Sequence, residues 1–382
     1  MAAGVEEADL RRPLGCWLGT REFTLLSYTV QPVYASRVNG FTGGIDHLAG
    51  DLITGGQRCA WHLARKRVRR VDQFGRETSA GESWPQTHPR FPEREVFAYQ
   101  APWLRELPPG LTAPAYYGHT VTPSEVWLWL EWIEPARPAR LEWADFRQVA
   151  EALGRWHAPP RVGGPKAAPW LAAQAVEYFH GVTQAWVAKW VDAIPEGWDH
   201  PAIRPWIPRT LESAWEQYTA IAPRLIARAQ ALPPVLSHGD CYSRNLLPRQ
   251  QAGRRELVAV DWACVGHQWL GSDVGHLAAA SLAFRDGPET HWSAFLAALT
   301  DAYVDGLTAA GASDWRDEAR RGAATTAVLR WAPLGLVDVL SCLGQPVPWL
   351  PEAEDERDAM IRHHLRLSAW LLGEVLPTLS PT

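Results

Sequence analysis

The chain has 382 residues, of which 47% are hydrophobic and 21% are charged. This composition is close to the average of globular proteins and excludes a disordered, collagen-like or disulfide-scaffold chain. The net charge of −5 gives no long-range attraction to a polyanion, so we expect no nucleic-acid partner.

The N-terminal segment and the cysteines bear on where the protein resides. Residues 1–12 are acidic before they are basic and have no apolar core, unlike a signal peptide. The chain contains no uncharged apolar stretch of about 18 residues, so we expect no membrane span. The five cysteines are far apart and form no CxxC pair, which argues against disulfides and a zinc site. These features predict a cytoplasmic protein.

The first third of the chain has the pattern of β-strands. Residues 23–35 and 45–53 are expected to form two strands, and a tight Thr-Gly-Gly-Gln turn then leads into a third strand at 58–69, so we expect a hairpin. Alternate residues of a strand share a face, which places Lys66 beside small side chains such as Ala64. That face leaves room for a ligand against Lys66.

Lys66 is notable because lysine is rare in this chain. Only three of the 37 Lys and Arg residues are lysines, namely Lys66, Lys166 and Lys189. Lys66 lies in a basic run at 65–70 whose other four basic residues are all arginine. Such a run is usually a solvated strand or loop edge. Because arginine is strongly preferred over lysine in this chain, a lysine at this position indicates that an ammonium group is needed there.

A helix, a buried strand and a linker follow. A proline can begin a helix over about residues 93–107, and the apolar run at 126–130 is typical of a buried strand. The segment 134–140 contains two prolines and is the best candidate for a linker. We therefore expect an N-terminal lobe over residues 1–133 and a helical C-terminal lobe over 134–382.

The rest of the chain is mainly helical. Apolar residues recur every three or four positions over 146–156, 176–190 and 211–225. Helical periodicity explains the spacing of the tryptophans there, so we expect core side chains rather than sugar-stacking platforms. A strand-rich island at 235–260 interrupts the helices, which resume at Asp273.

The strand-rich island contains the residues that indicate chemistry. The segment 238–245 reads His-Gly-Asp-Cys-Tyr-Ser-Arg-Asn, and Asp261 follows an apolar strand sixteen residues after Asn245. Phosphoryl transfer requires a carboxylate beside the attacking hydroxyl and hard oxygen ligands for Mg²⁺. Asp240, Asn245 and Asp261 have that arrangement. An Asx-capped loop is the structural alternative for the first two.

The His-Gly-Asp-x4-Asn motif and the later Asp-Trp pair resemble the catalytic and metal-binding motifs of the aminoglycoside phosphotransferase and choline kinase family. That family has the protein-kinase-like fold. The resemblance implies an α+β chain of two lobes, a small antiparallel β-sheet lobe with one helix and a larger, mainly helical lobe. It also implies that Asp240 is catalytic and that Asn245 and Asp261 bind Mg²⁺.

The resemblance also implies nucleotide-binding residues. Lys66 resembles the lysine that holds the α and β phosphates, where a planar guanidinium would fit poorly. Glu95 resembles the helix glutamate that pairs with this lysine, although Glu93 competes for that role and Glu95 could simply favour the helix dipole. Glu131 and Ile133 resemble the strand that links the lobes, whose backbone bonds the adenine edge.

Two residues and one loop have less specific resemblances. Asp273 resembles an aspartate that braces the catalytic loop, and a helix N-cap explains it equally well. His157 lies on a helix similar to one of the family, but a core or surface histidine is the simpler interpretation. Residues 39–44 would provide phosphate contacts, although they lack GxGxxG.

The implied activity is ATP-dependent transfer of a phosphoryl group to a hydroxyl of a small molecule, with Mg²⁺ and with GTP not excluded. The acceptor would be an antibiotic, a sugar or an amino alcohol. A metabolite kinase of choline, homoserine or sugar type is the alternative to a resistance enzyme, and a non-catalytic nucleotide-binding protein is the alternative of another class. Acidic residues at 352–358 suit either a cationic acceptor or a solvated helix start. Monomer and dimer both stay open.

Overall fold

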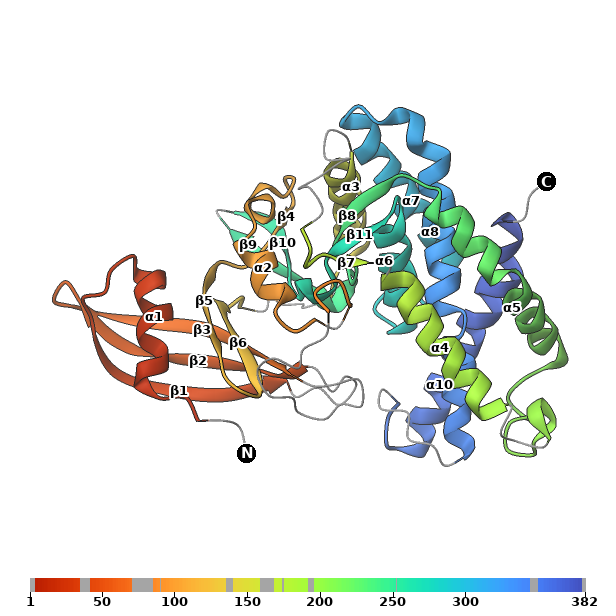
Figure 1. Ribbon diagram of the computed structural model, residues 1–382, viewed down its shortest axis with the longest axis horizontal. Coiled ribbons are helices and arrows are strands. Elements are labelled where there is room, and N and C mark those ends of the chain that lie inside the picture. The colour runs from red at the N-terminus through yellow and green to blue at the C-terminus, as the bar shows by residue number, and fades with distance from the viewer. Residues whose placement is uncertain are drawn as a thin grey trace.

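The computed structural model describes residues 4–34, 42–70, 85–89, 91–134, 140–158, 168–173, 175–191, 196–251, 253–343 and 350–379. Figure 1 shows the N-terminal β-sheet projecting from a larger body of helices, with small β-sheets between the two. The predicted α+β organisation is therefore confirmed.

The N-terminal sheet has five strands in the order β1-β2-β3-β6-β5, all antiparallel. Their bounds are β1 Thr24–Tyr34, β2 Thr42–Thr54, β3 Gln57–Arg69, β5 Tyr116–Val121 and β6 Glu125–Glu131. The predicted hairpin is present, since Thr54 pairs with Gln57. Both turn residues, Gly55 and Gly56, have positive φ, as a tight two-residue hairpin turn requires.

Alternate residues of β3 face two separate cores. Trp61 and Leu63 are fully buried in a cluster that includes Leu10 of helix α1 (Glu7–Leu18). Val68 and the buried Lys66 point to the opposite side, toward the main core. The sequence did not predict α1, which covers the first of these faces (Figure 1).

The predicted helix at 93–107 is divided. Helix α2 (Arg94–Gln100) ends because Ala101 precedes a proline and has an extended ψ of 133°. A 3-10 turn, η1 (Pro102–Glu106), continues the chain. Strand β4 (Leu111–Thr112) then pairs in parallel with β10 (Arg254–Ala259), far along the chain. The boundary between residues 133 and 134 stays a prediction, and residues 135–139 lie outside the described part.

The described part of the C-terminal region contains eight helices. They are α3 Trp143–His157, α4 Ala175–Val191, α5 Arg209–Gln230, α6 Ser272–Ala283, α7 Trp292–Ala309, α8 Arg316–Trp331, α9 Leu334–Val339 and α10 Glu354–Trp370. Every residue of α6 is buried, and this helix packs against α7 and α8. It forms a rigid support for the neighbouring loops.

Two small three-stranded sheets are formed mainly by strands of the C-terminal region. One has the order β4-β10-β9, with β9 at Leu246–Gln251, and the other has the order β7-β11-β8. The latter strands are β7 Ala172–Ala173, β8 Pro234–Ser237 and β11 Gly266–Trp269. The predicted strand-rich island is therefore present, and it is followed by a further strand, β11, which the sequence did not predict.

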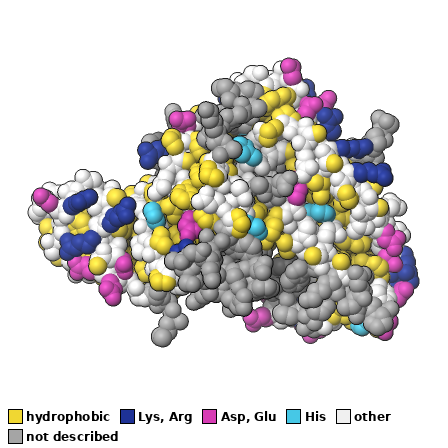
Figure 2. All heavy atoms as spheres, viewed as in Figure 1, with side chains coloured by type: hydrophobic (Ala, Val, Ile, Leu, Met, Phe, Trp, Pro, Cys, Tyr) yellow, Lys and Arg dark blue, Asp and Glu magenta, His cyan; other side chains and the backbone are white. Residues whose placement is uncertain are grey.

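Several helical tryptophans are core side chains, as predicted. Trp156 of α3 and Trp215 of α5 are buried. The stretch Ser313–Leu343 is long and apolar enough to cross a membrane, but 72% of its most apolar window is buried inside the structure, as in a core helix. On the face seen in Figure 2, basic and acidic side chains are interspersed in small groups.

Candidate active site

The loop between β8 and β9 presents Asp240. Gly239 before it has a φ of +79°, and a Cβ there would lie 2.2 Å from the backbone oxygen of Cys264, so the position requires glycine. The N–H of Asp240 donates to Nδ1 of His238 at 3.2 Å, and Nε2 of His238 donates to the carbonyl of Val260 at 3.0 Å. His238 thus ties Asp240 to the end of β10.

Both carboxylate oxygens of Asp240 are bonded. Oδ1 accepts from Nη2 of Arg330 at 2.7 Å and from Nε2 of His276 at 3.0 Å, and Oδ2 accepts from Nδ2 of Asn245 at 3.1 Å. Burial raises the pKa of Asp240, but the bond from His276 and the charge of Arg330 more than offset it and hold the pKa well below its ordinary value. The carboxylate is therefore ionised and fixed in orientation.

His276 donates to Asp240 as a neutral imidazole. Nε1 of Trp331 donates to its Nδ1 at 3.0 Å, so the proton lies on Nε2, which faces the carboxylate. Burial and then the charge of Arg330 lower the pKa of His276 to about 4. Sequence reasoning did not predict that Arg330 and His276 contact Asp240. The one available signal was an arginine at the end of the small and apolar run 322–329.

Asn245 lies at the end of the turn η3 (Ser243–Asn245). Its Nδ2 donates to the backbone carbonyl of Asp240 at 2.9 Å and to that residue's Oδ2, which leaves its own Oδ1 as an acceptor. Its backbone carbonyl accepts from the N–H of Val260 at 2.9 Å, next to Asp261. The two predicted metal ligands therefore come from neighbouring strand ends.

Lys66 bridges the sheet and the segment after β10. Its Nζ lies 2.6 Å from Oε2 of Glu95 and 2.8 Å from Oδ1 of Asp261. Oε1 of Glu95 accepts from the N–H of Trp262 at 3.2 Å. Asp261 has φ and ψ of 63°, a left-handed conformation that non-glycine residues adopt rarely and mainly at functional positions. Three predicted site residues from distant segments thus meet at one point.

The cluster carries more negative than positive charge. Burial lowers the pKa of Lys66, but the charges of Asp261 and Glu95 more than offset it, so the pKa lies above its ordinary value. Burial and the charge of Asp261 raise the pKa of Glu95, against the effect of Lys66. Two carboxylates share one ammonium, so an added cation would be stabilised here.

The structure distinguishes Glu95 from its competitor. Glu93 pairs with Arg70, with 3.1 Å between Oε1 and Nη2, whereas Glu95 contacts Lys66. Between them, the buried Arg94 donates five hydrogen bonds to backbone carbonyls, including that of Ala263. Arg94 anchors α2 to the segment that follows Asp261, and the sequence gave no hint of it.

Asn245 and Asp261 fit a Mg²⁺ ion. They offer an amide oxygen and a carboxylate, which are hard ligands, and the side chain of Asp261 is 33% exposed. Within the described ranges, no group of three or more His, Cys, Asp or Glu side chains could hold a metal. Mg²⁺ commonly uses one or two protein oxygens with water and substrate phosphates, so two ligands are sufficient.

Glu131 and Ile133 lie where β6 leaves the sheet. The N–H of Glu131 donates to the carbonyl of Ala115 at 2.8 Å, so this donor is already used. The Glu131 side chain accepts from the N–H of Ala115 at 3.0 Å and from Nη1 of Arg249 at 2.9 Å. Ile133 is buried. An adenine contact by these two residues stays a prediction.

Asp273 braces the catalytic loop. Oδ2 accepts from the N–H of His238 at 2.8 Å and Oδ1 from the N–H of Gly239 at 2.9 Å. The N-cap of α6 is Gly271, so Asp273 is not the helix cap. His157 is a buried core histidine, with Nε2 3.5 Å from Oδ2 of Asp273. Of the predicted phosphate loop at 39–44, the structure describes only the last three residues.

Comparisons with known proteins identify the family and the fold. A sequence model of the phosphotransferase enzyme family matches residues 74–324. No curated protein sequence matches the chain significantly. The fold is similar to that of an ethanolamine kinase of Plasmodium vivax, with a TM-score of 0.51 and 9% identity over 94% of this chain and 84% of that one. The fold is also similar to that of a microcompartment-associated aminopropanol kinase, with a TM-score of 0.50 and 14% identity over 92% of this chain and 93% of that one.

Proposed function

Because the chain belongs to the phosphotransferase enzyme family and is thus a phosphotransferase with an alcohol-type acceptor, we propose that it transfers the γ-phosphoryl group of ATP to a small molecule. The observation that carries this proposal is the anchored carboxylate of Asp240. Phosphoryl transfer depends mainly on positioning and on charge stabilisation. The fixed, ionised carboxylate of Asp240 would position the acceptor, and the ammonium of Lys66 would stabilise charge on the phosphates.

Asp240 acts on the acceptor through Oδ2. Oδ1 already receives bonds from Arg330 and His276, whereas Oδ2 receives one bond from Asn245. The acceptor hydroxyl therefore donates to Oδ2, which orients its oxygen toward the phosphorus and takes the proton late in the transfer. The low pKa of Asp240 is consistent with a group that orients the nucleophile rather than one that deprotonates it beforehand.

Lys66 and Glu95 act at the nucleotide end. Lys66 would bond the α and β phosphates through its Nζ, which lies 2.6 Å from Oε2 of Glu95 and is oriented by that carboxylate. Asn245 and Asp261 would hold Mg²⁺, and the bound ion would neutralise charge on the phosphate oxygens. The carbonyl of Glu131 and the backbone of Ile133 would bond the base, and the same contacts leave GTP as the alternative nucleotide.

The acceptor class is an amino alcohol, an antibiotic or a sugar. The first turn of α10 carries exposed carboxylates, which would attract a cationic acceptor; they are Glu354, Asp355 and Glu356. The same residues also suit the helix dipole. If Glu354→Gln combined with Glu356→Gln leaves the KM of a cationic acceptor unchanged relative to a neutral one, the attraction is absent.

A mass-shift screen tests the function. Hydroxylated metabolites and antibiotics are incubated with Mg²⁺ and ATP, and a gain of one phosphoryl group is scored for the wild type and for Asp240→Asn. We expect the variant to lose turnover while it still binds ATP, and Asp301→Asn, an exposed carboxylate on α7, to behave as the wild type. ATP binding without turnover on any acceptor in the wild type would favour the non-catalytic alternative. Loss of both turnover and binding in Asp240→Asn would refute the assignment of Asp240.

A further inference from the structure

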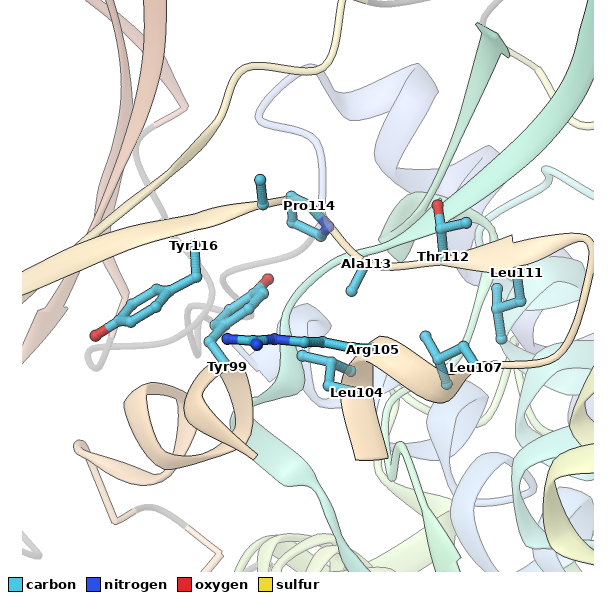
Figure 3. A pocket seen from close by; sticks show the side chains of 10 residues that line it. Tyr99, Leu104, Arg105, Leu107, Leu111, Thr112, Ala113, Pro114 and Tyr116 are labelled. Atoms are coloured by element: carbon cyan, nitrogen blue, oxygen red, sulfur yellow. The ribbon is translucent and has the colours of Figure 1, made fainter. Parts of the chain in front are cut away.

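A pocket of about 400 Å³ lies beside the C-terminal end of α2 (Figure 3). It is bounded by α2, the turn η1, strand β4 and the start of β5. None of the residues assigned above to ATP, Mg²⁺ or the acceptor lines it. Pockets of a few hundred Å³ with apolar walls and a few polar groups are the usual size and character of small-molecule sites.

Tyr99 supplies a buried polar group that lacks a partner. Tyr99 is only 3% exposed, and its hydroxyl has no hydrogen-bond partner among the residues that the structure describes. Figure 3 shows this hydroxyl on the side of the Tyr99 ring that faces Pro114. The ring of Tyr116 stacks on Tyr99, with centroids 5.8 Å apart, but the hydroxyl of Tyr116 bonds to His119 at 2.6 Å. A ligand oxygen in the pocket would satisfy the hydroxyl of Tyr99.

Arg105 supplies a positive charge at the same pocket. It lines the pocket from η1, and none of the ion pairs found among the described residues involves it. The remaining lining is mostly aliphatic and includes Leu104, Leu111 and Pro114. A phenol donor, a guanidinium and an aliphatic wall together match a carboxylate attached to an apolar body.

The walls of the pocket belong to the elements that position the active site. Tyr99 lies one helical turn after Glu95 on α2, and Glu95 holds Lys66. The hydroxyl of Thr112 accepts from Arg249 at 3.4 Å, and Arg249 also pairs with Glu131 at 2.9 Å. A molecule in this pocket would therefore contact residues that are linked to Glu95 through α2 and to Glu131 through Arg249.

We propose that this pocket binds a small organic carboxylate with an aromatic or branched aliphatic body, and that the bound carboxylate is an effector of nucleotide binding. Binding of the carboxylate does not rest on the proposed function, because it can be measured without nucleotide or turnover, whereas the effector role rests on the proposed nucleotide site.

The experiment uses the full chain and a panel of probes, namely 4-phenylbutyrate, 1-naphthylacetate and 4-methylvalerate with their uncharged amides. Ligand-observed NMR should show that a carboxylate of the panel binds with a Kd of roughly millimolar, as its small size implies, and more tightly than its amide. Tyr99→Phe and Arg105→Gln should each weaken binding about fivefold. Ala113→Phe, which fills the pocket, should abolish it.

Matched controls lie on other surfaces. Tyr117→Phe, from the neighbouring position on β5, and Arg320→Gln, an exposed arginine on α8, should leave probe binding unchanged. Tyr99→Phe should keep the Tm or raise it, because the hydroxyl has no partner to lose. Absence of binding by every carboxylate, or equal binding by wild type and Ala113→Phe, would overturn the site. A nucleotide Kd that does not change when a probe is bound would overturn the effector role.

Discussion

Arg330 and Asp240 form an ion pair with 2.7 Å between Nη2 and Oδ1, although 90 residues separate them along the chain. Arg330 also donates to the carbonyl of Gly239 at 2.7 Å, and its guanidinium lies 4.5 Å from the ring centroid of Phe179. This two-point contact, supported by a cation–π interaction, fixes both the backbone and the side chain of the catalytic loop. Helix α8 is therefore part of the candidate active site.

Replacing Arg330 with glutamine should lower kcat by about 10- to 100-fold, because the carboxylate of Asp240 would lose its orientation. The charge of Arg330 is one of the causes that depress the pKa of Asp240. Its removal should raise that pKa and move the acidic limb of the pH–rate profile to higher pH. Steady-state rates between pH 4 and 9 measure both effects, because the acidic limb that Asp240 causes lies below this range in the wild type and should move toward it in the variant.

Arg320→Gln is the control on the same helix, since Arg320 is exposed and pairs with Asp301. It should leave both kcat and the pH profile unchanged. An Arg330→Gln enzyme with lower kcat and an unshifted acidic limb would show that Arg330 acts on the loop geometry and not on the charge of Asp240.

The pH dependence of stability should report on His276. Its pKa is about 4 in the folded protein, compared with an ordinary value of 6.5. Between these values the unfolded chain binds a proton that the folded protein does not, so this contribution to stability is complete above pH 6.5 and is lost as the pH falls to 4. The loss is at most about 3 kcal/mol.

Urea unfolding at pH 7.5 and at pH 4.5 measures this loss. In His276→Gln the free energy of unfolding should fall less between the two pH values than in the wild type, because glutamine does not titrate. Equal falls in both proteins would contradict a neutral buried His276.

Local patterns in the sequence predicted much of the fold and of the site. The hairpin follows from a Gly-Gly turn between two strands, and the facing of Lys66 follows from the alternation of β3. The motif that contains Asp240 and Asn245 is contiguous, and Asp261 follows one strand later. Each of these features depends on residues close in the chain, so the sequence alone predicts it.

Other features depend on tertiary contacts that local patterns do not contain. Arg330 and His276 reach Asp240 from helices that begin far along the chain, and nothing near either residue specifies that contact. Helix α1 was not predicted. Its apolar residues are buried against the sheet, and the sequence of the helix alone does not indicate that contact. The early end of α2 has a local cause, the proline at 102. The prediction continued the helix to residue 107 because the residues around this proline have a helical pattern.

Lys66→Arg should reduce kcat/KM by about 100-fold, although it preserves the charge. The Nζ of Lys66 is buried between two carboxylate oxygens at 2.6 and 2.8 Å, and a larger planar guanidinium cannot occupy that point. Initial rates with varied ATP measure the effect. Lys166→Arg, at a position outside the described residues, is the matched control and should change kcat/KM little. Comparable activity of both variants would remove Lys66 from the nucleotide site.

Gly239→Ala should show how tightly the catalytic loop is packed. Gly239 and Gly56 have the same φ of +79°, but a Cβ on Gly56 would meet open space, whereas a Cβ on Gly239 would lie 2.2 Å from the carbonyl oxygen of Cys264. Gly56→Ala should therefore cost only the strain of a left-handed alanine, about 1–2 kcal/mol. Gly239→Ala carries the same strain and also forces the Cys264 backbone away, which adds about 1–3 kcal/mol.

Urea unfolding of the two variants isolates the steric contribution, because the backbone strain is common to both. The displaced loop also carries Asp240, so Gly239→Ala should lose turnover even at temperatures where it is fully folded, whereas Gly56→Ala should retain it. If both variants lose the same stability and keep their activity, the loop has room to move, and Asp240 is held by its side-chain partners rather than by the close approach of the Gly239 and Cys264 backbones.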